Sequence, residues 1–230
     1  MKNIAIIPAR SGSKGLLNKN IKDFCGKPLM AYSIEAAQKS KCFDEIMVST
    51  DSNEYAEIAK KCGAKVPFFR SAQNSDDGSN SWDAVREVLL WYENHGKRFD
   101  TICLLQPTSP LRRVDDIISA YSLFVEKNAE AVTSVCEVDH SPLWCMELPR
   151  DLSMQDFRKK CMADLRQKLP VYYRLNGAIY IRHVIYDRGN VWLLDKKEFA
   201  YIMPKNISID IDCILDFKLA EMIKEKCNIQ

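Results

Sequence analysis

The chain has 230 residues, of which 47% are apolar and 28% charged, which is ordinary for a globular protein with a substantial core. Its 33 lysines and arginines nearly balance 31 acidic residues, and the net charge of +2 argues against a nucleic-acid-binding protein, which usually carries a strong basic excess. No apolar run approaches the ~18 residues of a membrane-spanning helix, and the first residues lead into a strand without a signal peptide, so no membrane association is expected.

The chain opens with a short apolar strand and a loop rich in small and basic residues. Residues 4–7 can form a strand buried on both faces, and Pro8, which lacks an N–H group, ends it. The following loop places Arg10, Lys14 and Lys19 among small residues. Exposed amides and positive charge at the carboxyl end of a strand suit a polyphosphate. Neither GxGxxG nor GxxxxGK[ST] matches, so an ordinary solvated connection is the alternative.

Strands and helices then alternate along the first half of the chain. Apolar spacing predicts helices at residues 29–41, 53–62, 82–94 and 115–127. Short apolar runs predict strands at residues 43–49, 65–69, 101–105 and 131–138. This alternation indicates an α/β fold with a mostly parallel sheet and helices on both faces.

Two polar residues follow predicted strands, where α/β folds place their ligands. Asp51 ends the second strand, although Asp51 or Ser52 could instead cap the next helix. Gln106 follows the strand at 101–105, and Pro107 and Pro110 stiffen the turn behind it. We therefore expect Gln106 to point in a fixed direction at the edge of the sheet.

Periodicity weakens between residues 139 and 170, which contain turn residues and scattered charges. We expect this segment to be an insertion lying over the core, so that residues 1–230 form a single domain. Strand character returns at residues 174–181, where Gly177 permits close approach of the backbone. The nine cysteines are scattered without a CxxC motif, which indicates reduced, mostly packing cysteines in a cytoplasmic protein.

An acidic pair lies near the end of the chain. Residues 208–212 alternate as in a strand, which would put Asp210 and Asp212 on one face, ~7 Å apart. Two such carboxylates can share a Mg²⁺ ion together with phosphates and water. Alternatively, Asp212 caps the final helix, predicted at 213–226, and Asp210 is a solvated residue. Asp216, in the first turn, is expected only to stabilise that helix.

Five segments, in order along most of the chain, resemble the acylneuraminate cytidylyltransferase (CMP-sialic acid synthetase) family, including its legionaminic and pseudaminic acid branches. They are IPARSGSKG with the following Lys-Asn, VSTD, QPTSPLR, RLNGAIY and the terminal IDID. The resemblance implies a Rossmann-like, GT-A-like three-layer sandwich in which residues 139–170 form a dimerisation insertion. It also implies a homodimeric enzyme of cell-surface polysaccharide biosynthesis that joins CTP to a 2-keto acid sugar.

The resemblance also assigns roles to individual residues. Lys19 and Arg10 would contact the phosphates, and Asp210 and Asp212 would bind Mg²⁺; these four are the expected catalytic residues. The residues expected around CTP are Ala9, Arg10, Ser13, Lys14, Gly15, Lys19 and Asn20, with Arg70, Gly78, Ser79 and Ser81 on the cytidine side. The residues expected to face the sugar are Gln106, Arg166, Arg174, Asn176 and Tyr180. For Arg166 and Arg174, guanidinium can grip a sugar carboxylate bidentately, whereas a surface salt bridge is the alternative.

Other functions stay open at this level. A CMP-KDO synthetase acts on an eight-carbon sugar, but the Lys-Asn pair and RLNGAIY favour the nine-carbon branch. A GT-A glycosyltransferase also uses a DxD motif, but here the motif lies close to the end of the sequence. A non-enzymatic nucleotide-binding module is the third alternative. Trp144 stands where bacterial sialic acid enzymes carry a lysine, so the identity of the nine-carbon sugar is not fixed by the motifs, and no general base is evident.

Overall fold

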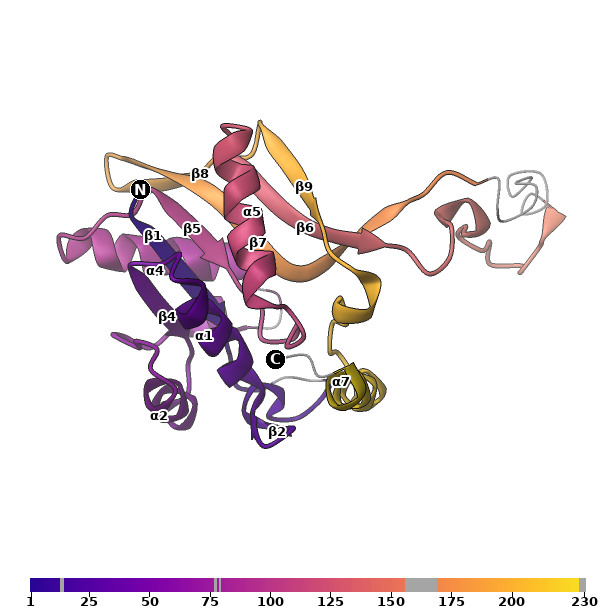
Figure 1. The fold of residues 1–230 in the computed structure, drawn as a ribbon, viewed down its shortest axis with the longest axis horizontal. Coiled ribbons are helices and arrows are strands. Elements are labelled where there is room, and N and C mark those ends of the chain that lie inside the picture. Colours follow the sequence, from indigo (N-terminus) through magenta and orange to yellow (C-terminus); the bar gives the residue numbers. More distant parts are fainter. Residues whose placement is uncertain (13–14, 77, 79, 156–168, 228–230) are drawn as a thin grey trace.

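The computed structural model describes residues 1–12, 15–76, 78, 80–155 and 169–227. It consists of a central sheet with helices on both faces and an arm that projects from one end (Figure 1). The strands of the sheet are β1 (Asn3–Pro8), β4 (Glu45–Ser49), β5 (Thr101–Leu104), β6 (Ala131–Glu137), β7 (Tyr173–Asp187), β8 (Asn190–Leu193) and β9 (Glu198–Ile202). A separate two-stranded ribbon consists of β2 (Asp23–Phe24) and β3 (Lys27–Pro28).

Five of the six helices in the described part of the chain match predicted helices, and the short α3 was not predicted. The six helices are α1 (Leu29–Ser40), α2 (Asn53–Lys61), α3 (Ala72–Ser75), α4 (Ser81–Asn94), α5 (Val114–Glu126) and α7 (Ile214–Cys227). Single turns of 3-10 helix are η1 (Lys19–Ile21), η2 (Pro142–Trp144) and η4 (Lys205–Ile207). Across the described part of the chain, no helix combines the length and apolar character that crossing a membrane requires.

The order of the sheet is β4-β1-β5-β7-β6-β9, and β8 pairs with β7. Strand β1 is parallel to β4 and β5, and β6 is parallel to β9, whereas β7 is antiparallel to each of its partners. Strand β7 thus runs against all the others. The predicted α/β class with a mostly parallel sheet is confirmed, and the reversal at β7 is a feature that the alternation of elements did not reveal.

The core has two parts, one on each face of the sheet. Strand β1 shows why, because its alternate side chains point to opposite faces. Ala5 and Ile7 pack with the cluster beneath α1, α5 and α7, while Ile4 and Ile6 pack with the cluster beneath α4. All four are fully buried, which fixes the register of the strand whose end carries the basic loop.

Two predicted strands are wrong. At residues 65–69 the pairing stops after one bridge, between Lys65 and Met47, because Pro67 has no N–H group to extend a ladder. Residues 208–212 lie outside any strand, and Ile211 N donates instead to Thr108 O at 2.8 Å. The expected alternation holds only at the end of the segment, where Ile211 is fully buried and Asp212 is exposed, because Ile209 and Asp210 are both partly buried.

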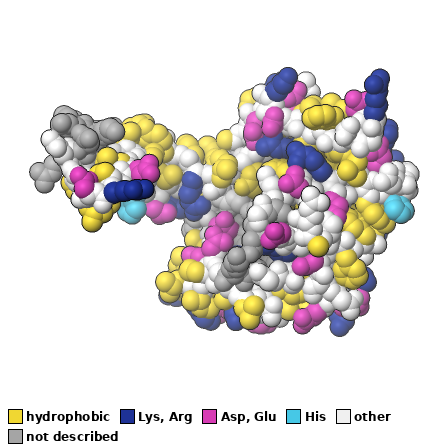
Figure 2. Space-filling model, turned by 180° about the vertical axis from the view of Figure 1, so that it is seen from behind, with side chains coloured by type: hydrophobic (Ala, Val, Ile, Leu, Met, Phe, Trp, Pro, Cys, Tyr) yellow, Lys and Arg dark blue, Asp and Glu magenta, His cyan; other side chains and the backbone are white. Residues whose placement is uncertain are grey.

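The insertion projects away from the sheet and does not lie over the core as expected (Figure 1). It begins where β6 ends and returns at β7, and its described residues outside those strands are 138–155 and 169–172. Apolar side chains are exposed along it, including Leu148, Leu152, Met154 and Val171. Figure 2 shows hydrophobic side chains on the surface of the arm. Residues 156–168 lie outside the described part.

Candidate active site

The loop after β1 is held by the end of β4. Ala9 N donates to Ser49 O at 2.9 Å, which continues the pairing of the two strands by one step. The Asp51 carboxylate then accepts from Ser11 N at 2.7 Å and from Ser11 Oγ at 3.0 Å. Of the two candidates for the cap of α2, Ser52 is the residue that accepts from its first turn. Asp51 therefore positions the loop, a role that motif reading did not assign to it.

Lys19 joins the amino-terminal loop to the acidic segment near the other end of the chain. Its Nζ donates to Ile211 O at 2.5 Å and contacts Asp212 Oδ1 at 3.2 Å. Lys19 is only 9% exposed, so its bond to Ile211 O is shielded from water, whereas the carboxylate of Asp212 is exposed. A Cβ atom on Gly15 would lie 2.4 Å from Asp212 O, so only glycine permits this approach. The structure thus brings Lys19, predicted on the phosphate side, next to Asp212 of the predicted metal pair.

The remaining residues predicted on the phosphate side lie along the same loop. Asn20 Nδ2 donates to Arg10 O at 3.1 Å, and Arg10 Nη1 donates to Ser75 O at 3.2 Å. The buried Asn20 thus fixes the backbone that carries the Arg10 side chain. Ser13 and Lys14 lie outside the described residues.

Asp210 and Asp212 differ in their surroundings. Asp212 is exposed, while Asp210 is partly buried, and its Oδ1 atom has no hydrogen-bond partner among the described residues. Burial raises the pKa of Asp210 and the charge of Asp212 adds to the shift, although a hydrogen bond between its carboxyl group and the Thr108 side chain opposes it. A buried carboxylate oxygen without a donor is an atom that a cation would satisfy. Within the described residues, no group of three or more His, Cys, Asp or Glu side chains could hold a metal, so any ion here would rely on this pair and on its substrate.

Gly177 brings the predicted sugar-side glutamine close to the acidic pair. Its φ of +74° is one that side chains rarely adopt, and a Cβ there would lie 2.6 Å from Gln106 Oε1 and 3.3 Å from Asp210 Oδ2. Gln106 and Asp210 therefore flank one point of β7, although 104 positions separate them in the sequence (210 − 106). The three segments that carry these residues meet at this point.

Arg112, which ends the QPTSPLR motif, holds that arrangement from within the protein. Its Nη1 donates to Ala178 O at 2.7 Å and to Gln106 O at 3.3 Å, and its Nη2 donates to Ser33 Oγ at 2.5 Å. Burial lowers its pKa to about 10, which leaves it cationic at neutral pH. The motif indicated a ligand site, but this side chain ties β7, α1 and the loop after β5 together.

Arg70, predicted on the cytidine side, is also hydrogen-bonded to groups of the protein. Its Nε donates to Ser49 Oγ at 2.9 Å and its Nη2 donates to Ser49 O at 2.7 Å, and burial lowers its pKa to about 10. Gly78 is exposed and Ser81 begins α4. Ser79 lies outside the described residues. Contact of these residues with a nucleotide stays a prediction.

The predicted sugar-side residues on β7 differ in accessibility. Arg174 is partly exposed and donates to Ser208 O at 3.3 Å. Asn176 is fully buried, and its side chain bonds to Ser134 Oγ at 2.6 Å and Ser208 Oγ at 3.0 Å, so its observed contacts are structural.

Tyr180 is partly buried between the sheet and α4. It packs edge-on against Trp82 at 5.9 Å between ring centroids, and burial raises its pKa. Arg166 lies outside the described residues. Contact of the sugar-side residues with a substrate stays a prediction.

The chain is similar to known proteins over nearly its whole length. A family model described as cytidylyltransferase matches residues 4–225. A pseudaminic acid cytidylyltransferase of Campylobacter jejuni is 34% identical over 97% of this chain and 96% of the relative. A CMP-N,N'-diacetyllegionaminic acid synthase of Legionella pneumophila is 36% identical over 98% of this chain and 97% of the relative. An N-acylneuraminate cytidylyltransferase of Escherichia coli is 38% identical over 100% of this chain and 54% of the relative.

Solved structures give the fold independently. A CMP:2-keto-3-deoxy-manno-octonic acid synthetase complexed with CTP superposes with a TM-score of 0.70 at 15% identity, covering 98% of this chain and 99% of the other. A 4-diphosphocytidyl-2C-methyl-D-erythritol synthase from Anaerococcus prevotii superposes with a TM-score of 0.61 at 11% identity, covering 97% and 98%. At such identities the likeness is one of fold alone. The match over nearly the whole sequence, to relatives of one enzyme class, shows that this chain belongs to the cytidylyltransferase family.

Proposed function

We propose that this enzyme transfers the cytidylyl group of CTP to the anomeric hydroxyl of a nine-carbon 2-keto acid sugar and releases pyrophosphate. The relatives that match from end to end are named for pseudaminic and legionaminic acids, and the longer relative is named for N-acylneuraminate. The eight-carbon alternative has weaker support, because that neighbour is only 15% identical.

The observation that carries this proposal is the contact of Lys19 with Ile211 O and Asp212, at 2.5 and 3.2 Å. It puts a cation from the loop after β1 beside the acidic pair, so one triphosphate could touch both. Lys19 and Arg10 would offset the negative charge that develops on the departing pyrophosphate. The chain thus contributes positioning and charge, and the reaction needs no covalent intermediate with the enzyme.

The acidic pair suits Mg²⁺. The unpartnered Asp210 Oδ1 and the exposed carboxylate of Asp212 offer the oxygen ligands that this ion prefers. When bound there, Mg²⁺ would neutralise charge on the α-phosphate and make the phosphorus more electrophilic. Asp210→Asn should raise the Mg²⁺ concentration for half-maximal rate by about tenfold or more. An unchanged Mg²⁺ dependence would show that Asp210 does not bind the metal.

The sugar would lie beside Gly177. Gln106 reaches this point from the loop after β5, and Arg174 on β7 carries the positive charge that a sugar carboxylate requires. Tyr180 follows on the same strand. Because Asn176 is buried with its side chain bonded to protein groups, we assign it the role of holding Gly177 and its neighbours in place.

Pyrophosphate release tests the proposal directly. The chain is incubated with CTP, Mg²⁺ and one sugar acid at a time: pseudaminic, N,N'-diacetyllegionaminic, N-acetylneuraminic or KDO. We expect turnover with at least one nine-carbon acid at a kcat/KM at least about tenfold above that with KDO. Fastest turnover with KDO would make the chain a synthetase for the eight-carbon sugar. If the chain binds CTP but releases no pyrophosphate in the presence of any of the four acids, only a nucleotide-binding role would be left.

We further propose a homodimer formed through the arm and a cytoplasmic location. Leu148, Leu152 and Met154 are exposed on a segment that projects from the body, and burial against a second copy would remove them from water (Figure 2). Light scattering at micromolar concentration should give twice the chain mass, and Leu152→Asp should give monomer. A monomeric parent chain would refute the dimer. The seven cysteines whose side chains the structure describes are all unpaired thiols, which supports a reducing compartment.

A further inference from the structure

The segment that carries the acidic pair, residues 208–212, lies outside any strand, between η4 and α7. Its second half is held from two sides, because Ile211 N donates to Thr108 O at 2.8 Å and Ile211 O accepts from Lys19. The Thr108 side chain also bonds to the carboxyl group of Asp210. What holds the first half of the segment therefore helps to decide how far Asp210 lies from β7.

Ser208 holds that first half from inside the protein. It is fully buried, and its Oγ donates to Pro204 O at 2.9 Å and accepts from Asn176 Nδ2 at 3.0 Å. Arg174 Nη2 adds a bond to the backbone oxygen of Ser208 at 3.3 Å. The other contact of Asn176 Nδ2 is Met203 Sδ at 3.2 Å, and a thioether is a weak acceptor. The Ser208 hydroxyl is therefore the strong link between β7 and the acidic segment.

The hydrogen bonding continues through Asn176 to Ser134 on β6. Ser134 Oγ, also fully buried, donates to Asn176 Oδ1 at 2.6 Å and accepts from Ile179 N at 2.8 Å. Asn176 Oδ1 accepts a second bond, from Ala178 N at 3.2 Å. Backbone N–H groups only donate and the Pro204 carbonyl only accepts, so the direction of each of these bonds is fixed, as is the orientation of the Asn176 amide. A buried network with its donors and acceptors matched in this way specifies one arrangement of its members.

This network lies beside the point where the predicted ligand groups meet. Gly177 follows Asn176 on β7, and a Cβ on Gly177 would lie 3.3 Å from Asp210 Oδ2. Ser208 precedes Asp210 by two residues in the segment. A shift of Ser208 therefore moves the Asp210 carboxylate relative to Gly177.

We propose that Ser208 is a positioning residue, which sets the place of the Asp210 carboxylate against β7. Ser208 does not belong to the residues predicted for CTP, sugar or metal, and it acts through Asn176 and the backbone of its own segment. Loss of a group that orients a metal ligand from outside the metal site commonly weakens metal binding by about 10-fold to 100-fold. The proposal rests on the proposed function in one respect, the placing of CTP and Mg²⁺ at the acidic pair, and it does not depend on the sugar.

Calorimetric titration of CTP into the intact chain tests this role without sugar acid. One arm contains Mg²⁺ and the other contains EDTA in its place, at equal ionic strength. The measured quantity is the ratio of the CTP dissociation constant in EDTA to that in Mg²⁺, which reports the coupling between nucleotide and metal. The affinity of CTP itself for Mg²⁺ is the same for every variant and cancels in the comparison. A variant that is only less stable loses folded protein in both arms, so its ratio does not change.

Two substitutions of Ser208 should lower this ratio to different extents. Ser208→Ala removes the strong acceptor of Asn176 Nδ2 and the link of the segment to β7, so the ratio should fall by about tenfold. Ser208→Cys keeps a weaker donor and acceptor at the same position, so its ratio should lie between those of the parent chain and Ser208→Ala. The cysteine variant also tests the role if the alanine variant does not fold.

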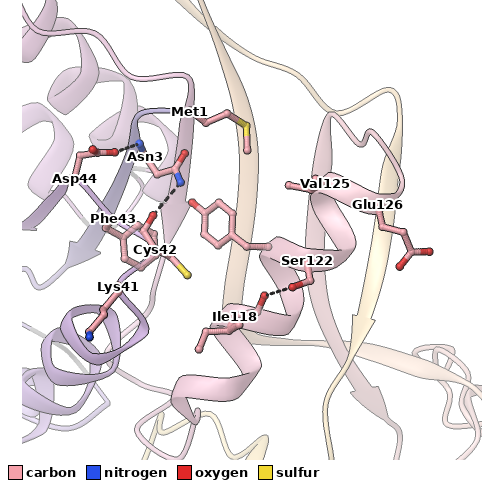
Figure 3. Close-up of a pocket in the computed structure, with 11 residues that line it drawn as sticks. Met1, Asn3, Lys41, Cys42, Phe43, Asp44, Ile118, Ser122, Val125 and Glu126 are labelled. Carbon is pink, nitrogen blue, oxygen red and sulfur yellow. Dashed lines mark hydrogen bonds between the residues drawn. The ribbon is translucent and has the colours of Figure 1, made fainter.

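Ser40→Ala is the matched control. Ser40 is 7% exposed at the end of α1, and its Oγ also makes one donated and one accepted bond, to Ala37 O at 2.7 Å and from Cys42 N at 3.3 Å. Cys42 lines a pocket of about 760 Å³ beside α5, at the amino ends of β1 and β4 (Figure 3). The control therefore lies at the end of β1 away from the basic loop, and its ratio should stay within about twofold of the parent value.

An unchanged ratio in Ser208→Ala, or in Ser208→Cys where the alanine variant does not fold, would overturn the positioning role. An equal fall in Ser40→Ala or a parent ratio near one would overturn it as well. None of these measurements includes a sugar acid. Pyrophosphate release can therefore succeed while the positioning role fails, and the role can hold while no sugar acid is turned over.

Discussion

Gly177→Ala should separate the catalytic geometry from the stability of the fold. A Cβ at this position meets Gln106 Oε1 at 2.6 Å and Asp210 Oδ2 at 3.3 Å, on a backbone with a φ of +74°. The left-handed backbone alone makes alanine cost about 1–2 kcal/mol. The Gln106 amide is the flexible end of a side chain and can move away cheaply, so the clash displaces the site more than it unfolds the chain.

Gly189→Ala is the matched control. Gly189 has a φ of +80°, close to that of Gly177, but no atom lies within 4 Å of its Cβ position. Both variants therefore carry the same backbone strain, and their free energies of unfolding in urea should agree within about 1 kcal/mol. Only Gly177→Ala moves the groups beside the predicted sugar site.

Pyrophosphate release measures the difference, using the sugar acid that gives the fastest turnover. A displacement of about 1 Å at a reacting centre can cost about 100-fold, so we expect kcat/KM of Gly177→Ala to fall by about 10-fold to 100-fold. Gly189→Ala should stay within about twofold of the parent chain. Equal activity of the two variants, both folded, would show that Gln106 and Asp210 do not need their close approach at Gly177.

Two further predictions concern the loop after β1 and the edge of the sheet. Asp51→Ala removes both carboxylate acceptors of Ser11, which should destabilise the observed conformation of the loop by about 1–2 kcal/mol. CTP affinity measured by calorimetry should therefore fall by about 5-fold to 30-fold. An unchanged affinity would contradict the role of Asp51. Burial disfavours the charged form of Glu45, but hydrogen bonds and charges from Lys97 and Lys65 outweigh it and hold the pKa of its carboxyl below the ordinary value. A lowered native pKa stabilises the fold above pH ~4.3, and this contribution is lost as the pH falls from there towards the native pKa. Urea unfolding of Glu45→Gln should therefore show a smaller loss of stability between pH ~5 and ~3 than the parent chain.

Elements with one buried face were predictable from the sequence. The helix expected at 29–41 is α1, Leu29–Ser40, and the helix expected at 115–127 is α5, Val114–Glu126. Their apolar stripes pack on one face of the sheet, so local spacing and tertiary burial agree. Boundaries shift by one residue because the last turn depends on a cap and not on the stripe.

Strand prediction failed where the hydrogen-bond partner decided the outcome. Residues 208–212 alternate in the sequence, but in the structure Ile209 and Asp210 are both partly buried, so the pattern is realised only at Ile211 and Asp212. A strand needs a neighbouring ladder, and here Thr108 O accepts one bond from a loop. Strand β7 was predicted too short: it was expected at residues 174–181 but runs from Tyr173 to Asp187, antiparallel to its partners. Local periodicity predicts neither the length of such a strand nor its direction in the sheet.

The sequence predicted which segments form the candidate site, but it did not always predict the role of each side chain in them. Lys19 and Asp212 meet as their motifs suggested. Arg112 and Asn176 belong to the same motifs, yet both are buried and bonded to protein groups. A motif records which residues are required, and a residue can be required for holding a loop as much as for touching a substrate. Asp51 is such a residue too, and only its distance to Ser11 reveals it.

Lys19 shows how closely structure and chemistry are joined at this site. Its ammonium group is nearly buried, and such a group is tolerated only with strong acceptors, which Ile211 O and Asp212 provide. Those acceptors come from the segment that also carries Asp210, so the pairing that satisfies the lysine also sets the distance between the basic loop and the acidic pair. Gly15 makes the approach possible on the same side by leaving room for Asp212 O. Contacts within the protein therefore fix the positions of Lys19 and Asp212 relative to each other.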